Sequence, residues 1–241
     1  MTKSEEEEID SNQNGLDICE LFFNSDYEKQ EIILPSGRKM SFLGLTANMT
    51  DSDLTGQILW PGCTLLMHWL DKNMQLFHGK TGVEVGAGTA ICSTFIAKYG
   101  EPKQIIATDG SPPVCELMQK NIDLHPGLKN ISCCVLDWGT EPTERFLEEK
   151  CHGEQFDFVY GSEIAYNENC VEGLVTTARI LLKPNGLFVI GHIDRYAQTT
   201  RAFFRELKNQ NFELESEVPW DDLINYRMEL IVGSVYVFKR K

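Results

Sequence analysis

The stretch Thr81-Gly-Val-Glu-Val-Gly-Ala-Gly-Thr-Ala90 decides the fold class of this chain. It starts as a short apolar run that holds one carboxylate, Glu84, and it continues as a glycine-rich turn. A strand that enters such a turn before a helix is typical of open α/β sheets, which bind ligands beyond the carboxyl ends of their strands. Glycines at Gly86 and Gly88 let the backbone turn tightly and let a ligand approach it. We therefore expect Gly86, Ala87 and Gly88 to line a ligand site.

Beyond this stretch, short apolar runs alternate with helix-length amphipathic segments. This alternation is typical of a parallel sheet with helices on both faces. The last two expected strands, 212–218 and 229–238, are too close in sequence for a crossover helix, so we expect them to be antiparallel. The other expected strands are 82–85, 104–108, 132–136, 156–161 and 187–191, and the expected helices are 59–70, 90–98, 113–124, 144–150, 171–182 and 198–209.

The N-terminal part of the chain does not follow this pattern. Residues 1–15 are acidic and rich in Asn and Ser, so they bury too little apolar surface to fold, and we expect a disordered tail. Residues 16–55 form an extension in which Pro35-Ser-Gly-Arg38 separates two apolar runs, the pattern of a β-hairpin. Residues 56–241 hold the glycine-rich turn and form one domain.

Composition restricts the classes of partner. The 241 residues carry a formal net charge of −14, which argues against general binding of nucleic acid, because phosphate contacts need basic patches. The same charge favours a protein substrate with a basic surface. No apolar run approaches the roughly 20 residues that cross a bilayer, so no membrane partner is expected. We expect a monomer.

The start of the chain and its cysteines indicate a compartment. Residues 1–8 are acidic, whereas a secretory signal has a basic start and an apolar stretch. We therefore expect a cytoplasmic protein, with the nucleus as a second location. The eight cysteines are then expected to be reduced, and neither they nor the five histidines have the spacing of a metal site.

Two carboxylates beside the glycine turn narrow the choice of ligand. Glu84 lies near the end of a buried strand, where a charge needs a partner such as the amino group of S-adenosylmethionine (SAM). Asp109 ends the next strand, where an acidic side chain can accept both ribose hydroxyls. The small third residue of a dinucleotide fingerprint would fall at Ile91, so a nicotinamide cofactor fits poorly. Singly, these residues are equally well explained as a turn, a surface glutamate and a helix cap; together they indicate SAM.

The ends of the third and fourth strands supply further candidates. Asp137 is placed to accept from an adenine amino group, and Trp138 to lie against the ring; a helix cap with a packing tryptophan is the alternative. The fourth strand leads into Ser162, Glu163 and Tyr166, which we expect near the reacting groups. His192 and Tyr196 follow the fifth strand, and packing or surface roles account for them as well as a substrate contact does.

These motifs resemble the seven-stranded SAM-dependent methyltransferases from about residue 55 to the C-terminus. They are E-x-G-x-G at Glu84–Gly88, then Asp109, Leu136-Asp-Trp138 and Leu181-Leu-Lys-Pro-Asn-Gly186. The resemblance implies a Rossmann-like α/β fold of seven strands, mostly parallel, with the last one antiparallel. It implies that Asp109 holds the ribose and that Asp137 and Trp138 hold the adenine. Residues 56–241 would then be the methyltransferase domain.

Three further features resemble the family 16 protein methyltransferases, which are mostly lysine methyltransferases with relatives that modify histidine. They are the hairpin, the segment Gly56-Gln-Ile-Leu-Trp-Pro61 and Glu163-x-x-Tyr166. The resemblance implies that Trp60 and the glycine turn line the methionine end of SAM. The family usually has Asp where this chain has Glu163. The longer side chain leaves the choice between lysine, the expected acceptor, and histidine open.

The resemblance makes this chain a methyltransferase of a protein side chain. In that reading Glu163 orients the incoming amine or imidazole, and Tyr166 shapes the channel. A small-molecule or RNA methyltransferase and a non-catalytic SAM-binding interaction module are the alternatives. The acidic balance weighs against RNA, and the intact Glu84, Gly86, Gly88 and Asp109 weigh against a module that has lost its reaction.

Overall fold

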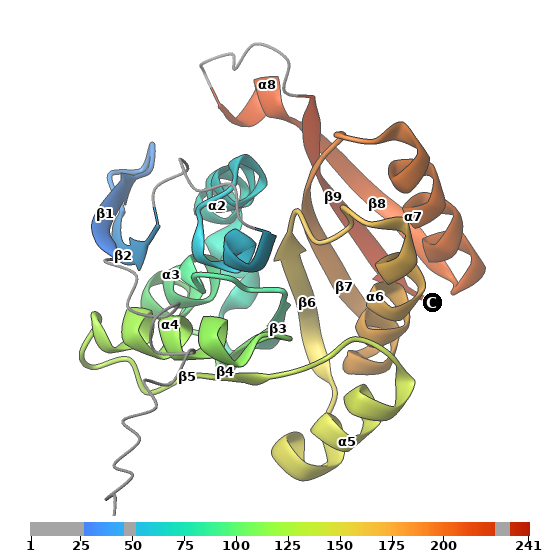
Figure 1. The fold of residues 1–241 in the computed structure, drawn as a ribbon, viewed down its shortest axis with the longest axis horizontal. Coiled ribbons are helices and arrows are strands. Elements are labelled where there is room, and N and C mark those ends of the chain that lie inside the picture. Colours follow the sequence, from blue (N-terminus) through green and yellow to red (C-terminus); the bar gives the residue numbers. More distant parts are fainter. Residues whose placement is uncertain (1–26, 46–51, 225–231) are drawn as a thin grey trace, which may run out of the picture.

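A computed structural model describes residues 27–45, 52–224 and 232–241, so the expected tail, 1–15, lies outside the described residues. Its centre is one seven-stranded sheet in the order β5-β4-β3-β6-β7-β9-β8 (Figure 1). The strands are β3 (Thr81–Val85), β4 (Gln104–Asp109), β5 (Ile131–Val135), β6 (Phe156–Ser162), β7 (Leu182–Ile193), β8 (Phe212–Pro219) and β9 (Gly233–Arg240).

The strand directions confirm the expected fold class. Neighbours from β5 to β7 are parallel, whereas β9 is antiparallel to both β7 and β8. In the described part of the connection between β8 and β9, the short helix α8 (Trp220–Leu223) follows β8 directly. Residues 229–231 of the expected last strand lie outside the described residues, and β9 itself begins at Gly233.

Helices cover both faces of the sheet, as expected (Figure 1). One face carries α2 (Pro61–Asn73), α3 (Ile91–Tyr99) and α4 (Pro112–Asp123), and the other carries α5 (Thr140–Cys151), α6 (Glu168–Leu181) and α7 (Ala197–Asn209). Two short 3₁₀ helices, η1 (Ser52–Gln57) and η2 (Met74–Phe77), flank α2. In the described ranges, none of the helices is both long and apolar enough to cross a bilayer.

The central strand β6 shows how the two faces form two cores. Phe158 and Tyr160 pack in the core beneath α2 and α3, whereas Val159 packs in the core beneath α5, α6 and α7. All three are at most 5% exposed. Side chains alternate between the faces of a strand, so a strand covered by helices on both sides is apolar throughout.

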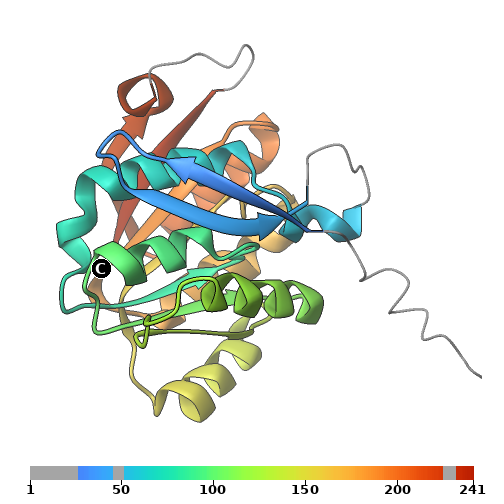
Figure 2. The same cartoon turned by 90° about the vertical axis from the view of Figure 1, so that its left-hand side faces the viewer.

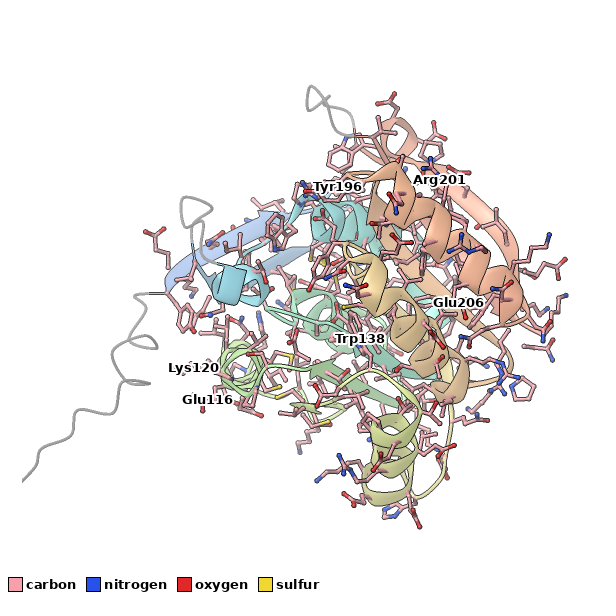
Figure 3. The ribbon with its side chains drawn as sticks, turned by 45° about the vertical axis from the view of Figure 1, so that its right-hand side comes forward. Glu116, Lys120, Trp138, Tyr196, Arg201 and Glu206 are labelled. Atoms are coloured by element: carbon pink, nitrogen blue, oxygen red, sulfur yellow. The ribbon has the colours of Figure 1, made fainter. Side chains whose placement is uncertain are left out.

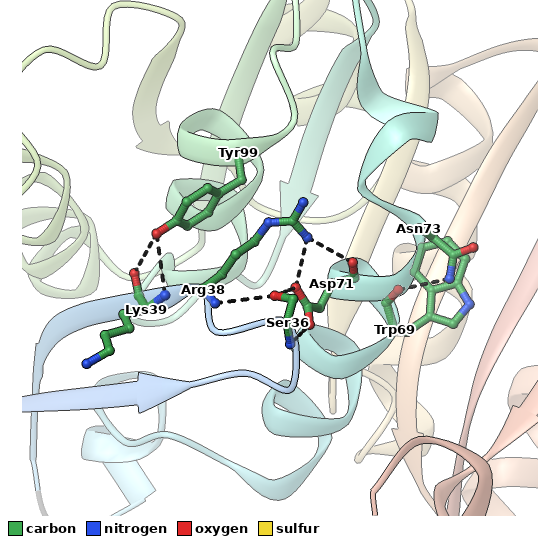
Figure 4. Close-up of polar contacts among 7 residues, drawn as sticks. All are labelled: Ser36, Arg38, Lys39, Trp69, Asp71, Asn73 and Tyr99. Atoms are coloured by element: carbon green, nitrogen blue, oxygen red, sulfur yellow. Dashed lines mark hydrogen bonds and ion pairs between the residues drawn. The ribbon is translucent and has the colours of Figure 1, made fainter.

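The N-terminal hairpin is present and is packed on the helices. Strands β1 (Glu28–Ile33) and β2 (Lys39–Gly44) pair in antiparallel fashion, and Figure 2 shows them lying across the outside of the helices. Asp71 of α2 holds the turn: its carboxylate accepts from the Ser36 hydroxyl at 2.5 Å and from Arg38 Nη1 at 2.9 Å (Figure 4). Leu45 then donates to the Gln57 carbonyl at 2.8 Å, which ties the hairpin to η1.

Most element boundaries differ from the expected ones by a few residues, and two of these differences have a visible cause. Helix α2 begins at Pro61 rather than Leu59, because Trp60 has an extended backbone. Strand β7 begins at Leu182 rather than Leu187, because Leu182 pairs with Phe156 before the strand bulges. Leu187 pairs with Phe158, so residues 183–186 lie opposite one residue of β6 and form the compact turn that the sequence indicates there.

Candidate active site

The glycine turn after β3 needs both of its glycines. Gly86 and Gly88 have φ values of 64° and 54°, in the left-handed region that side chains disfavour. A Cβ at Gly86 would lie 2.6 Å from Ile164 Cγ2, and one at Gly88 would lie 2.8 Å from the backbone oxygen of Gly56. The turn is therefore packed too closely for any larger residue, as the sequence indicates.

A cavity of about 1150 Å³ opens beside this turn, at the carboxyl edge of the sheet. Among the described residues, every predicted site residue except Glu84 lies on its wall. These residues are Trp60, Gly86, Ala87, Gly88, Asp109, Asp137, Trp138, Ser162, Glu163 and Tyr166. The ends of β3, β4, β5 and β6 supply most of them, because parallel strands bring their carboxyl ends to one edge.

Asp109 joins the end of β4 to the glycine turn. Its carboxylate accepts hydrogen bonds from the Gly88 and Ser111 amides, each at 3.1 Å. Burial raises the pKa of Asp109, while these backbone hydrogen bonds lower it in part. Each carboxylate oxygen has a second lone pair, so Asp109 can still accept from a hydroxyl group in the cavity.

Asp137 and Trp138 follow β5, the strand next to β4. Asp137 is exposed, and Trp138 is partly buried. The ring of Trp138 lies 3.2 Å from the position of a Cβ at Gly86, and the residue also packs on Gly173 of α6. Trp138 thus has the packing role of the alternative reading and faces the cavity as well. The adenine contacts of both residues stay predictions.

Glu84 has a partner within the chain, Ser93 of α3. Its side chain is buried, with the residue 1% exposed, and it accepts from the Ser93 amide at 3.0 Å and the Ser93 hydroxyl at 2.6 Å. The Ser93 hydroxyl is also 2.8 Å from the Tyr160 hydroxyl. Burial raises the pKa of Glu84 to about 7. Helix α3 thus supplies a partner for the carboxylate, which is outside the cavity lining, and the contact of Glu84 with the amino group of SAM stays a prediction.

Glu163 lies where β6, β7 and α2 meet. Its backbone has a φ of 51°, which is strained for a residue with a side chain, and its amide donates to the Gly191 carbonyl at 2.8 Å. One carboxylate oxygen accepts from the Gly62 amide, in the first turn of α2, at 3.0 Å. A Cβ at Gly62 would lie 2.5 Å from Glu163 Cγ, so only glycine allows this approach.

The other carboxylate oxygen of Glu163 binds a residue that the sequence reasoning missed. Arg195 donates to it from Nε at 2.8 Å and also from Nη2, and its guanidinium carbon lies 5.2 Å from the centre of the Trp60 ring. Trp60 in turn donates to the Thr55 carbonyl at 2.8 Å. The one available signal was a charged residue two positions after an apolar strand, at the edge of the sheet where Glu163 was also expected.

The two candidates that follow β7 have different surroundings. His192 is 3% exposed, lies 3.0 Å from the Thr200 hydroxyl and has a pKa lowered by burial, which fits a packing role. Tyr196, at the start of α7, is 64% exposed and lines the cavity (Figure 3). Among the described residues, no group of three or more acidic, cysteine or histidine side chains is arranged to hold a metal ion.

Solved structures share this fold. Ribosomal protein L11 methylase from Lactobacillus delbrueckii subsp. bulgaricus matches with a TM-score of 0.53 and 17% identity, over 84% of this chain and 94% of that one. SMU.776, solved in complex with SAH, matches with a TM-score of 0.58 and 17% identity, over 88% of this chain and 56% of that one. At this identity the two matches show that the chain shares the fold of these methyltransferases.

Sequence comparison gives the family. The family model described as lysine methyltransferase (Methyltransf_16) matches residues 40–210, so the chain belongs to that family. Protein-lysine N-methyltransferase EFM3 of Chaetomium thermophilum is 27% identical over 79% of this chain, which spans 55% of that protein's length. EEF1A lysine methyltransferase 3 of Mus musculus is also 27% identical, over 80% of this chain and 78% of that one.

The residues of the cavity fit the SAM of this family. The turn exposes backbone where Gly86 and Gly88 have no side chains, Asp109 offers a carboxylate for hydroxyl groups, and Trp138 offers an aromatic surface. Asp137 adds an exposed acceptor on the same wall. The donors and acceptors are those that a charged amino acid joined to a nucleoside requires, and SAM is the cofactor.

Proposed function

We propose that this protein transfers the methyl group of SAM to the side-chain amine of a lysine in a protein with a basic surface. The observation that carries the proposal is the position of Glu163, whose carboxylate lies on the wall of the cofactor cavity together with Tyr166 and Tyr196. Family membership and the named activities of the two relatives support a lysine acceptor. The net charge of −14 supports a basic partner.

Bound SAM supplies a methyl carbon made electrophilic by its sulfonium. The chain itself has to hold an acceptor nitrogen in line with that carbon, an effect that can supply roughly 7–11 kcal/mol of the barrier. The lysine ammonium group would first release a proton to water, and Glu163 would then accept a hydrogen bond from the neutral amine and direct its lone pair at the methyl carbon, with SAH as the leaving group. Tyr166, which is 57% exposed, would form one side of the channel, and its ring face would stabilise a cation by about 0.5–2 kcal/mol.

The test uses SAM with a radiolabelled methyl group, the purified protein and a cell extract, with and without nuclease. We expect label on a discrete protein band in both samples, and methyl-lysine after acid hydrolysis of that band. Methylhistidine in the hydrolysate would show that histidine is the acceptor. Label that is lost after nuclease treatment would show that the substrate is RNA. SAH binding without labelled product in any fraction would favour a non-catalytic module.

Glu163→Gln gives the matched test of the residue. We expect it to lower the labelling rate about 100-fold and to leave SAH binding within twofold of the wild type, because glutamine lacks the charge that pairs with an ammonium group. Glu172→Gln, on the exposed side of α6, should change neither. A variant that lost SAH binding and turnover together would contradict the role given to Glu163.

The monomeric state and the cytoplasmic location belong to the same proposal. Light scattering of the purified protein tests the first, and imaging of the tagged protein in cells tests the second.

A further inference from the structure

The side chain of Arg195 occupies a position between a carboxylate and an aromatic ring. Two of its nitrogens donate to the same oxygen of Glu163, one of them at 2.8 Å, and its guanidinium carbon lies 5.2 Å from the centre of the Trp60 ring. A carboxylate beside a ring face is the environment that binds an organic cation. The structure therefore contains a cation site formed by Glu163 and Trp60, and a group of the chain itself fills it.

This cation site belongs to the cofactor cavity. Trp60, Glu163 and Arg195 line the cavity together with Tyr166 and the glycine turn. Under the proposed function, the ammonium group of a lysine has to reach the same carboxylate. Arg195 and an incoming lysine then compete for one site.

Hydrogen bonds fix the backbone next to Arg195, whereas the side chain of Arg195 is partly exposed to solvent. The Asp194 amide donates to the Val232 carbonyl at 2.9 Å, and the Asp194 carboxylate accepts from the Thr200 hydroxyl at 2.8 Å. The side chain of Arg195 is 38% exposed, so it can leave Glu163 by rotating about its own bonds. Because its guanidinium group is already in part solvated, Arg195 can move into water when another cation replaces it at Glu163.

We propose that Arg195 is an internal occupant of the acceptor site, which a primary ammonium group enters by displacing it. The inference rests on the proposed function and adds a residue that determines specificity. When no acceptor is bound, Arg195 compensates the charge of Glu163, whose side chain is only 9% exposed and would otherwise lack a cationic partner among the described contacts. An acceptor has to bind Glu163 and Trp60 better than Arg195 does.

A role of Arg195 in positioning Glu163 predicts a different result from a role as a competitor of the acceptor. If Arg195 served only to position Glu163, its removal would weaken ammonium binding. If it competes, its removal strengthens binding, because a site that is open for only part of the time lowers the apparent affinity by that fraction. The two roles predict opposite changes in one measured constant.

The measurement is an NMR titration of the full chain with ¹⁵N-labelled tryptophan indoles, using n-butylammonium as the probe. The sequence has four tryptophans, and Trp60→Phe identifies the Trp60 indole signal. We expect Arg195→Met to lower the apparent dissociation constant of n-butylammonium by about fivefold relative to the wild type. Arg201→Met, which removes an exposed positive charge on α7 (Figure 3), should leave it unchanged. Glu163→Gln should abolish the response.

Three results would overturn the inference: an unchanged constant in Arg195→Met, a larger constant in Arg195→Met, or no response of Trp60 in any variant. SAH binding by each variant shows that it is folded, and Arg195→Lys, which keeps the charge but loses the planar fork, should fall between the wild type and Arg195→Met. The titration uses no methyl transfer. Competition at Trp60 without any labelled protein would therefore overturn the proposed function alone, whereas labelled lysine without competition would overturn this inference alone.

Discussion

Glu84 illustrates how a single buried carboxyl group supports the site without facing it. It lies between the buried residues Val83 and Val85 of β3, and its hydrogen bonds to Ser93 connect that strand to α3 on the far side of the glycine turn. Burial is the largest cause of its raised pKa and the charge of Asp109 adds to it, whereas hydrogen bonds from Ser93 and Cys92 lower the pKa in part. With its pKa raised to about 7, Glu84 is protonated in about half of the molecules at neutral pH, whereas an unperturbed glutamate would be almost fully ionised.

The raised pKa of Glu84 gives a prediction for stability against pH. The pKa is about 7 in the folded protein against 4.5 for an unperturbed glutamate, so the folded state binds more protons between these values. The contribution of Glu84 is fully present below about pH 4.5 and is lost as pH rises through 7. Between pH 5 and pH 8 we expect the wild type to lose up to about 3 kcal/mol of unfolding free energy relative to Glu84→Gln.

Urea unfolding of the wild type and Glu84→Gln at pH 5, 6, 7 and 8 checks this prediction. Burial lowers the pKa of His125 and of His192, so these groups act in the opposite direction, but they are present in both proteins and cancel in the difference. If the unfolding free energies of the two proteins ran parallel from pH 5 to pH 8, Glu84 would be ionised in the folded state across this range, and the prediction would be wrong.

At the scale of elements, the hairpin β1–β2 is joined to the site through side chains of the helices. Asn121 of α4 accepts from the Leu43 amide at 2.5 Å and donates to the Leu43 carbonyl and to the Thr89 carbonyl, next to the glycine turn. Asp71 holds the opposite end of the hairpin. These hydrogen bonds thus hold the hairpin in place, and the hairpin in turn holds η1, and with it Gly56, beside the cavity.

Asp71→Asn tests how much the Asp71 contacts contribute to holding the hairpin on the helices. Burial alone would raise the pKa of Asp71, but hydrogen bonds from Ser36 and Arg38 lower it overall, so the carboxylate is the favoured form. Since the Arg38 side chain is 33% exposed, we expect a loss of about 1–2 kcal/mol in unfolding free energy, together with faster hydrogen exchange in residues 28–44.

Glu101→Gln is the control for this experiment. Glu101 pairs with His78 at 3.2 Å, but both side chains are more than 70% exposed, so its loss should change the unfolding free energy by less than about 0.5 kcal/mol. Equal effects of Asp71→Asn and Glu101→Gln on the unfolding free energy would contradict the role of Asp71 in holding the hairpin.

At the scale of the whole molecule, cofactor binding and folding are linked, because the cavity wall comes from strands and helices that meet only in the folded chain. SAH at about 100 times its dissociation constant should add about 2.7 kcal/mol to the unfolding free energy and raise the melting temperature by about 5–10 °C. NAD at the same concentration should not, since Ile91 occupies the position where a dinucleotide fingerprint requires a small residue. Differential scanning calorimetry measures both.

Gly88→Ala and Gly153→Ala form a matched pair for this measurement. Both glycines have positive φ, at 54° and 78°, but a Cβ meets the Gly56 carbonyl oxygen at 2.8 Å in the first and nothing within 4 Å in the second. We expect Gly88→Ala to lose most of the SAH shift and Gly153→Ala to keep it. A full shift in Gly88→Ala would mean that the turn does not form the cofactor site.

The sequence by itself determined the features that depend on short stretches of chain. The alternation of strands and helices, the hairpin turn at residues 35–38 and the antiparallel end follow from hydrophobic periodicity, turn chemistry and loop length, all of which are local. The cavity wall was predictable for the same reason: the ends of parallel strands meet at one edge, so Asp109, Asp137 and Glu163 had to gather there.

Only the tertiary structure decided which partner each of these side chains meets. Glu84 pairs with Ser93 of a neighbouring helix, and Glu163 pairs with Gly62 and Arg195, which are 101 and 32 residues away in the chain. Such pairs depend on how helices pack across the sheet and on the rotamers that the packing allows, and hydrophobic periodicity carries no information on either. A charge in a buried position predicts that a partner exists, and the packing of distant elements determines which residue it is.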